Sequence, residues 1–120
     1  MAHIHSTPTH LVVQLQGLRQ MFGRWRPLTI PWTHVKGASI DERVARSFPG
    51  VRWGVSSHIP GVITLGSFRR DRHRHFWDVR DPRKAVIIEL TDEKYDRLIL
   101  EVTDPIAAAA AINERRLSLG

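Results

Sequence analysis

The chain has 120 residues, which is enough for one folded domain and too few for two. Its 42% hydrophobic and 25% charged content is ordinary for a globular protein, and the lack of cysteine excludes disulfides, thiolate metal sites and cysteine nucleophiles. Eighteen basic and twelve acidic residues give a formal net charge of +6, which favours an anionic partner. The longest apolar run, Ile106 to Ile112, falls far short of the roughly 20 residues of a membrane span, and the first ten residues lack the apolar core of a secretory signal. We therefore expect a cytoplasmic protein.

We expect residues 1–9 to be a disordered N-terminal segment and residues 10–116 to form the domain. Within the domain, apolar residues alternate with polar ones in one short segment after another, which is typical of half-buried strands. These segments are 11–15, 28–30 with a continuation at 35, 62–68, 76–79, 86–90 and 98–102. Six or more short strands spaced by roughly ten residues predict a β-barrel or a sandwich.

One helix is predicted, at about residues 104–116. Asp104 can accept hydrogen bonds from the first turn, and Pro105 suits the first helical position. The alanines at 107–111 favour the helix, and an apolar stripe that ends at Ile112 can dock on a sheet. Residues 41–46 fit either a short helix or a loop.

Several of these segments together resemble the bacterial pleckstrin-homology-like domains. They are Ile59–Phe68, Phe76–Arg80, Ala85–Leu90 and Leu98–Pro105, with Leu28–Val35 as the opening. The resemblance implies a mainly β protein: a single, strongly bent antiparallel β-barrel of about seven strands, capped by one C-terminal α-helix. It implies no catalytic residue and no cofactor. The phosphoinositide pocket of the eukaryotic pleckstrin-homology domains has no alignable counterpart in this chain.

Basic residues concentrate in two places that could contact a partner. Residues 69–75 connect two predicted strands and carry four arginines, whose guanidinium groups match phosphate and carboxylate. A solvated loop explains the same run and is the favoured interpretation. Two further arginines flank Trp25 in an arrangement that suits base stacking over a phosphate-gripping groove. The candidate anion- or partner-binding residues are Arg69, Arg70, Arg72, Arg74, Arg24 and Arg26.

We predict neither a metal site nor catalysis. His73 and His75 are two residues apart, so on a strand both rings would project from one face, but no third ligand is identifiable. The chain lacks the G-x-S-x-G, P-loop, G-x-G-x-x-G and H-E-x-x-H motifs. Ser56, Ser57 and His58 are neighbours, but sequence neighbours rarely form a catalytic pair. Asp78 and Asp81 could serve as an acid/base pair, but an Asp-x-x-Asp beside a proline turn accepts backbone hydrogen bonds more readily than it transfers protons.

The function that fits these observations is a non-catalytic binding module without cofactors. It would bind a protein partner or a second copy of itself through loops or a sheet edge, because exposed edges pair readily with copies of themselves. The alternatives are binding of nucleic acid by the basic surface and weak peripheral contact with a membrane. Four arginines contribute only about 4 kcal/mol at an anionic membrane, which is too little for membrane binding without a second anchor.

Overall fold

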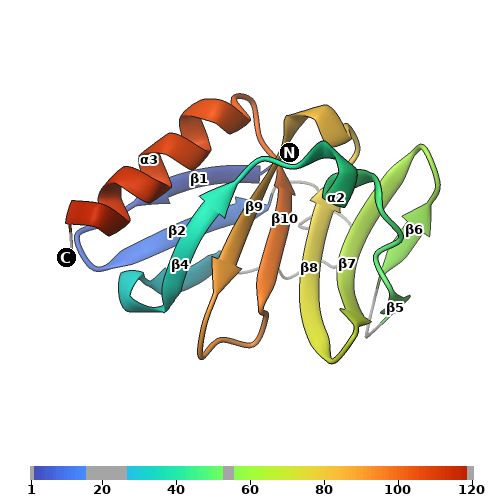
Figure 1. The fold of residues 1–120 in the computed structure, drawn as a ribbon, viewed down its shortest axis with the longest axis horizontal. Coiled ribbons are helices and arrows are strands. Elements are labelled where there is room, and N and C mark those ends of the chain that lie inside the picture. Colours follow the sequence, from blue (N-terminus) through green and yellow to red (C-terminus); the bar gives the residue numbers. More distant parts are fainter. Residues whose placement is uncertain (1, 16–26, 53–55, 119–120) are drawn as a thin grey trace.

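The computed structural model describes residues 2–15, 27–52 and 56–118, and this part of the chain is mainly β (Figure 1). Its strands form two sheets. The mainly β class and the helix near the C-terminus are as the sequence predicts. The smaller sheet contains β1 (Ala2–Ser6), β2 (His10–Leu15) and β3 (Leu28–Pro31). The larger sheet contains β4 (Val35–Ser39), β5 (Val51–Arg52), β6 (Ser57–Ile59), β7 (Ile63–Arg70), β8 (His73–Val79), β9 (Ala85–Leu90) and β10 (Arg97–Glu101). The helical elements are η1 (Trp32–His34), α2 (Glu42–Arg46), η2 (Pro82–Lys84) and α3 (Pro105–Ser118).

The N-terminal segment forms a hairpin with β2, so our expectation of disorder over residues 1–9 is wrong for residues 2–9. β1 runs antiparallel to β2, with Ile4 opposite Val13. A tight turn joins the two strands, in which the backbone N–H of His10 donates to Thr7 Oγ1 over 2.9 Å. Ile4 then packs against the core. The alternation of apolar residues in β1 is too short to predict a strand from the sequence. The segment is held in place by its pairing with β2 and its packing against the core.

The larger sheet is antiparallel except for one pairing, and it does not form the single closed barrel that the resemblance implies. Its strand order is β4-β9-β10-β8-β7-β5, with β6 also beside β7, and β10 runs parallel to β8. β8 and β9 do not pair with each other. β10, which follows β9 in the chain, lies between them and pairs with both. The Glu101 carboxylate holds the end of β10 there by accepting the backbone N–H groups of Arg80 and Asp81 at 2.8 and 2.9 Å. Among the described residues, strand pairing gives two separate sheets and no closed ring.

The main core lies between the two sheets and is covered at one side by α3 (Figure 1). The helix begins at Pro105, where Asp104 Oδ1 accepts the backbone N–H of Ala107 over 3.0 Å. Ala109 and Ile112 face inward and are buried. The predicted helix at about 104–116 is therefore confirmed, and it packs on β4 and β9.

A second, smaller core lies on the opposite face of the larger sheet. Phe68, Trp77, Ile87 and Ile99 project there from four strands and are all nearly inaccessible to solvent. Helix α2 covers one end of this outer face with Ala45. Of the two alternatives for residues 41–46, the short helix is the one observed. Because α2 is only five residues long, the other end of the face stays open.

Candidate functional site

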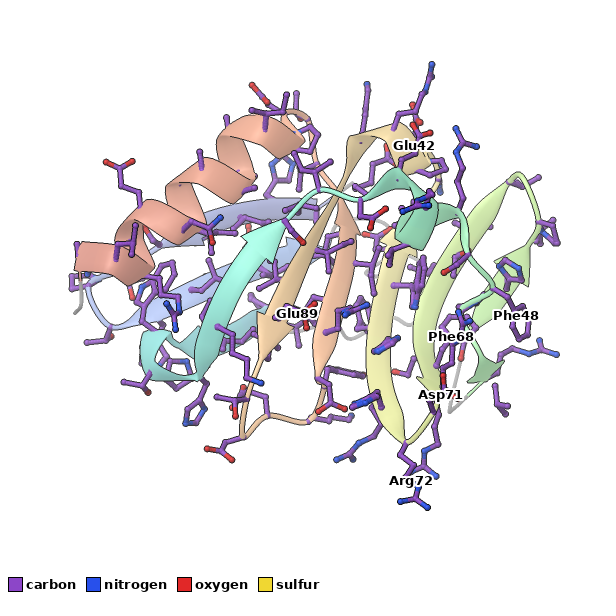
Figure 2. The ribbon with its side chains drawn as sticks, in the orientation of Figure 1. Glu42, Phe48, Phe68, Asp71, Arg72 and Glu89 are labelled. Carbon is purple, nitrogen blue, oxygen red and sulfur yellow. The ribbon has the colours of Figure 1, made fainter. Side chains whose placement is uncertain are left out.

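A cleft of about 580 Å³ opens on this outer face, beside α2 and the segment that follows it. Its floor is formed by β7, β8 and β10. In Figure 2, the labelled Asp71 and Arg72 lie at the tip of the β7–β8 hairpin, and Phe48 lies beside β6. The polar and aromatic side chains that line the cleft include Arg43, Phe48, Arg70, His73, His75 and Arg97.

Strand alternation on β8 places His73, His75 and Trp77 on the cleft side. The two imidazole rings stack nearly parallel, with 6.4 Å between their centroids and 7° between their planes. The prediction that both rings project from one face is therefore confirmed. The described residues contain no group of three or more His, Cys, Asp or Glu placed to hold a metal ion.

Most of the carboxylates around the cleft already accept hydrogen bonds from the protein. Asp41 Oδ1 caps α2 by accepting the backbone N–H groups of Arg43 and Val44 at 3.0 and 3.3 Å. Asp96 Oδ2 accepts the backbone N–H of Arg74 at 2.9 Å and lies 3.7 Å from His73 Nδ1.

The guanidinium groups are only partly used. Arg97 Nε contacts Glu89 Oε1 at 2.8 Å, and Arg70 donates one terminal nitrogen to the Phe48 carbonyl at 2.9 Å. Among the described residues, none forms a hydrogen bond or ion pair with the Arg43 guanidinium, which lies exposed on α2. Hydrogen-bond donors that are still available therefore outnumber available hydrogen-bond acceptors among the described residues of this cleft.

The pKa of His75 reflects these surroundings. Burial lowers it below the ordinary histidine value, and the positive charges of Arg97 and His73 lower it further. Asp96 and Glu89 act in the opposite direction and do not cancel the effect. His75 is therefore mainly neutral near pH 7.

The predicted basic residues do not converge on one point. Arg70 lines the cleft, whereas Arg69 and Arg74 are register partners at alternate positions, on the other face of the hairpin. Arg72 sits at the exposed tip with a left-handed φ of 68°. Arg24 and Arg26 lie outside the described residues.

Sequence reasoning missed the other residues of the cleft. In the sequence, Arg43 lies in a segment that fits either a short helix or a loop, and Arg97 directly precedes a predicted strand. Neither pattern indicates a binding residue. Phe48 carried no signal beyond its aromatic character. Their proximity depends on contacts between distant segments, which no spacing rule reports.

Of the residues weighed as catalytic groups, His58 and Asp81 make structural contacts. The His58 and Thr64 side chains hydrogen-bond at 2.9 Å across β6 and β7. Asp81 accepts the backbone N–H of Arg83 at 3.0 Å at the start of η2. Asp78 is 4% exposed, and burial raises the pKa of its carboxyl above the ordinary value.

A second candidate surface lies along the outer edge of the larger sheet, where β5 and β6 both pair with β7. The most exposed large apolar side chains there are Val51 (72%), Phe48 (65%), Val62 (59%) and Ile59 (52%). The register places Ile59 opposite Ile63, whose side chain packs towards the main core, whereas Phe48 contacts the His58 ring on the outer face. Apolar groups therefore flank this edge on both faces. A hollow of about 160 Å³ lies beside it, lined partly by Ile59 and Val62.

The opposite edge, along β4, is protected by α3. The Asn113 side chain accepts the backbone N–H of Ala38 through Oδ1 and donates Nδ2 to the Ala38 carbonyl, each at 2.8 Å. Arg116 Nε donates to the carbonyl of Val35 over 3.0 Å. These side chains occupy the positions that an added strand would use.

No protein family, curated protein or solved structure matches this chain in comparisons of sequence and fold. No helix in the described part of the chain has both the length and the apolar character that crossing a membrane requires.

Proposed function

We propose that the protein is a non-catalytic binding module that associates with a second copy of itself through the edge formed by β5 and β6. The supporting observation is the concentration of exposed apolar side chains at this edge, with Val51 72% and Phe48 65% exposed. An added strand would cover these side chains on both faces of the sheet and pair its backbone with the edge. The β4 edge offers no such site, because Asn113 and Arg116 occupy its backbone groups.

A second copy is the simplest occupant of the edge. A two-fold axis would bring the same apolar edge from each copy into contact, which is the commonest symmetry of soluble oligomers. Each copy carries a formal charge of +6, so the two copies repel one another at long range. Salt screens this repulsion, and self-association should therefore strengthen as ionic strength rises.

Light scattering after size-exclusion chromatography, over a range of protein concentrations, tests this proposal. Val51→Lys and Val62→Lys place a charge on the apolar edge and should shift the dimer to monomer. Ile106→Lys is the matched control, because Ile106 is 74% exposed on α3 and the substitution adds the same charge away from the edge. Thermal unfolding of all three variants verifies that each is folded.

The proposal requires a dimer in the unmodified protein and in Ile106→Lys, and its loss in the two edge variants. A monomer at every concentration and salt would refute it. So would a dimer that Ile106→Lys disrupts and the edge variants do not.

Binding of nucleic acid and weak membrane contact remain the alternative proposals. Affinity for an oligonucleotide should fall with salt, with a log–log slope of about −0.7 to −0.9 for each phosphate contacted. This trend is opposite to the one expected for self-association, so a single salt series separates the two. Sedimentation with anionic vesicles tests the membrane alternative.

We also propose a relationship to the bacterial pleckstrin-homology-like domains. The mainly β architecture and the C-terminal helix packed beside the core support it. The parallel pairing of β8 with β10 departs from the antiparallel barrel that this relationship implies.

A further inference from the structure

The cleft beside α2 has hydrogen-bonding capacity that the protein itself leaves unused, and nearly all of it is donor capacity. The Arg43 side chain extends from α2 into the lining, and Arg97 uses only Nε in its contact with Glu89. Among the described residues, the buried indole N–H of Trp77, which also lines the cleft, has no acceptor. A buried donor without an acceptor costs free energy. A ligand rich in acceptors would fit this wall.

The acceptors around the cleft are mostly committed. Asp41 is the cap of α2, and Asp96 is held by the backbone of β8. Asp71, whose side chain is 88% exposed, belongs to the hairpin tip. The pKa of His75 is lowered mainly by burial, with Arg97 as the largest charge contribution, so the floor of the cleft holds a partly desolvated imidazole beside a guanidinium group.

The lining also contains an apolar portion. Phe48 and Pro49 follow α2 and form part of the wall, and the carbonyl of Phe48 is held by Arg70. A cleft of about 580 Å³ lies within the usual size range of small-molecule sites. It combines a few placed polar groups with apolar walls, as such sites commonly do.

We propose that this cleft binds a small ligand that carries a carboxylate or phosphate group, held by the guanidinium groups of Arg43 and Arg97. The apolar part of the ligand rests against Phe48 and Pro49. Both anions match the planar guanidinium donors. Neither arginine belongs to β5 or β6, but Phe48 borders both this cleft and the proposed dimer edge, so the two sites are adjacent and share that residue.

Titration of the protein with inorganic phosphate and, separately, with succinate tests the site. Binding is measured by calorimetry and by the NMR resonance of the Trp77 indole N–H. Arg43→Gln is the test variant, and Arg46→Gln is its matched control. Both arginines are exposed on α2, but Arg46 pairs with Glu42 at 3.1 Å and does not line the cleft.

At least one of the two anions should bind with millimolar or better affinity and shift the Trp77 indole resonance. Loss of one charge-assisted contact should weaken that binding about tenfold in Arg43→Gln and leave Arg46→Gln within about twofold of the unmodified protein. Tighter binding of phosphate identifies a phosphate-bearing ligand, and tighter binding of succinate a carboxylate. The proposal is overturned if neither anion moves the indole resonance. It is also overturned if the two variants weaken binding equally, because the effect would then be general attraction to positive charge.

Discussion

The contact between Asn113 and Ala38 gives the sharpest test of how α3 is held to the sheet. The single side chain of Asn113 satisfies both backbone groups of Ala38, each over 2.8 Å. Asn113→Ala removes both hydrogen bonds and leaves two half-buried backbone groups without their protein partner. Gly37 lies beside this contact, and a Cβ on it would be 3.2 Å from Asn113 Oδ1, so the approach is close.

The expected loss of stability follows from these two bonds. Each contributes a net stabilisation of about 0.5–1.5 kcal/mol. Alanine is the better helix former by roughly 0.5 kcal/mol, which offsets part of the loss. The free energy of unfolding should therefore fall by about 1–2 kcal/mol, which lowers the Tm by on the order of 5 °C in a chain of this size.

Urea unfolding measures the change, and hydrogen exchange locates it. The amide of Ala38 should exchange faster in Asn113→Ala, because its acceptor is lost. Glu114→Ala is the control, since Glu114 is the next residue of α3 and is exposed; it should stay within about 0.5 kcal/mol of the unmodified protein. Unchanged exchange at Ala38, with stability equal to that of the control, would show that the side chain does not hold the edge.

Two further predictions concern a buried carboxyl and a close backbone approach. Burial raises the pKa of Asp78 in the folded state, so the folded protein binds the proton more tightly than the unfolded chain and loses stability as pH rises above the ordinary aspartate value. Urea unfolding at several pH values should show Asp78→Asn gaining stability relative to the unmodified protein as pH rises. Asp81→Asn should show the opposite trend, because hydrogen bonds from Arg83 lower the pKa of Asp81, and identical pH profiles for the two variants would contradict both assignments. Gly50→Ala should cost at least about 2 kcal/mol, since φ is +111° and the new Cβ would lie 2.4 Å from the Arg69 carbonyl oxygen. Gly61→Ala, at φ +76° with open space around it, should cost about 1 kcal/mol, and equal losses at the two glycines would remove the steric argument.

The local elements of the fold follow from the sequence. Val86, Ile88 and Leu90 alternate with residues that face the other side of the sheet, and all three are buried in the main core. The terminal helix is equally local, because Asp104 and Pro105 act within its own first turn. The shared face of His73 and His75 is fixed by the geometry of a strand. Such signals depend only on residues a few positions apart.

The positions of these elements relative to one another depend on contacts far apart in the chain. Alternation shows that β8 and β10 are strands, but not that they pair in parallel; that pairing brings together segments about 20 residues apart, and Glu101 also reaches the backbone of Arg80 and Asp81. A segment as short as β1 is positioned by its pairing with β2 and by the packing of Ala2 and Ile4 against the main core.

The candidate sites divide in the same way. The arginines at 69–74 are adjacent in sequence, yet the hairpin sends Arg70 to one face and Arg69 and Arg74 to the other. The cleft instead unites Arg43 of α2 with Arg97 of β10. Sequence determined the longer strands and the terminal helix, because hydrophobic periodicity reports whether one face is buried. Only the tertiary structure decided which charged groups meet, because that depends on strand order and register.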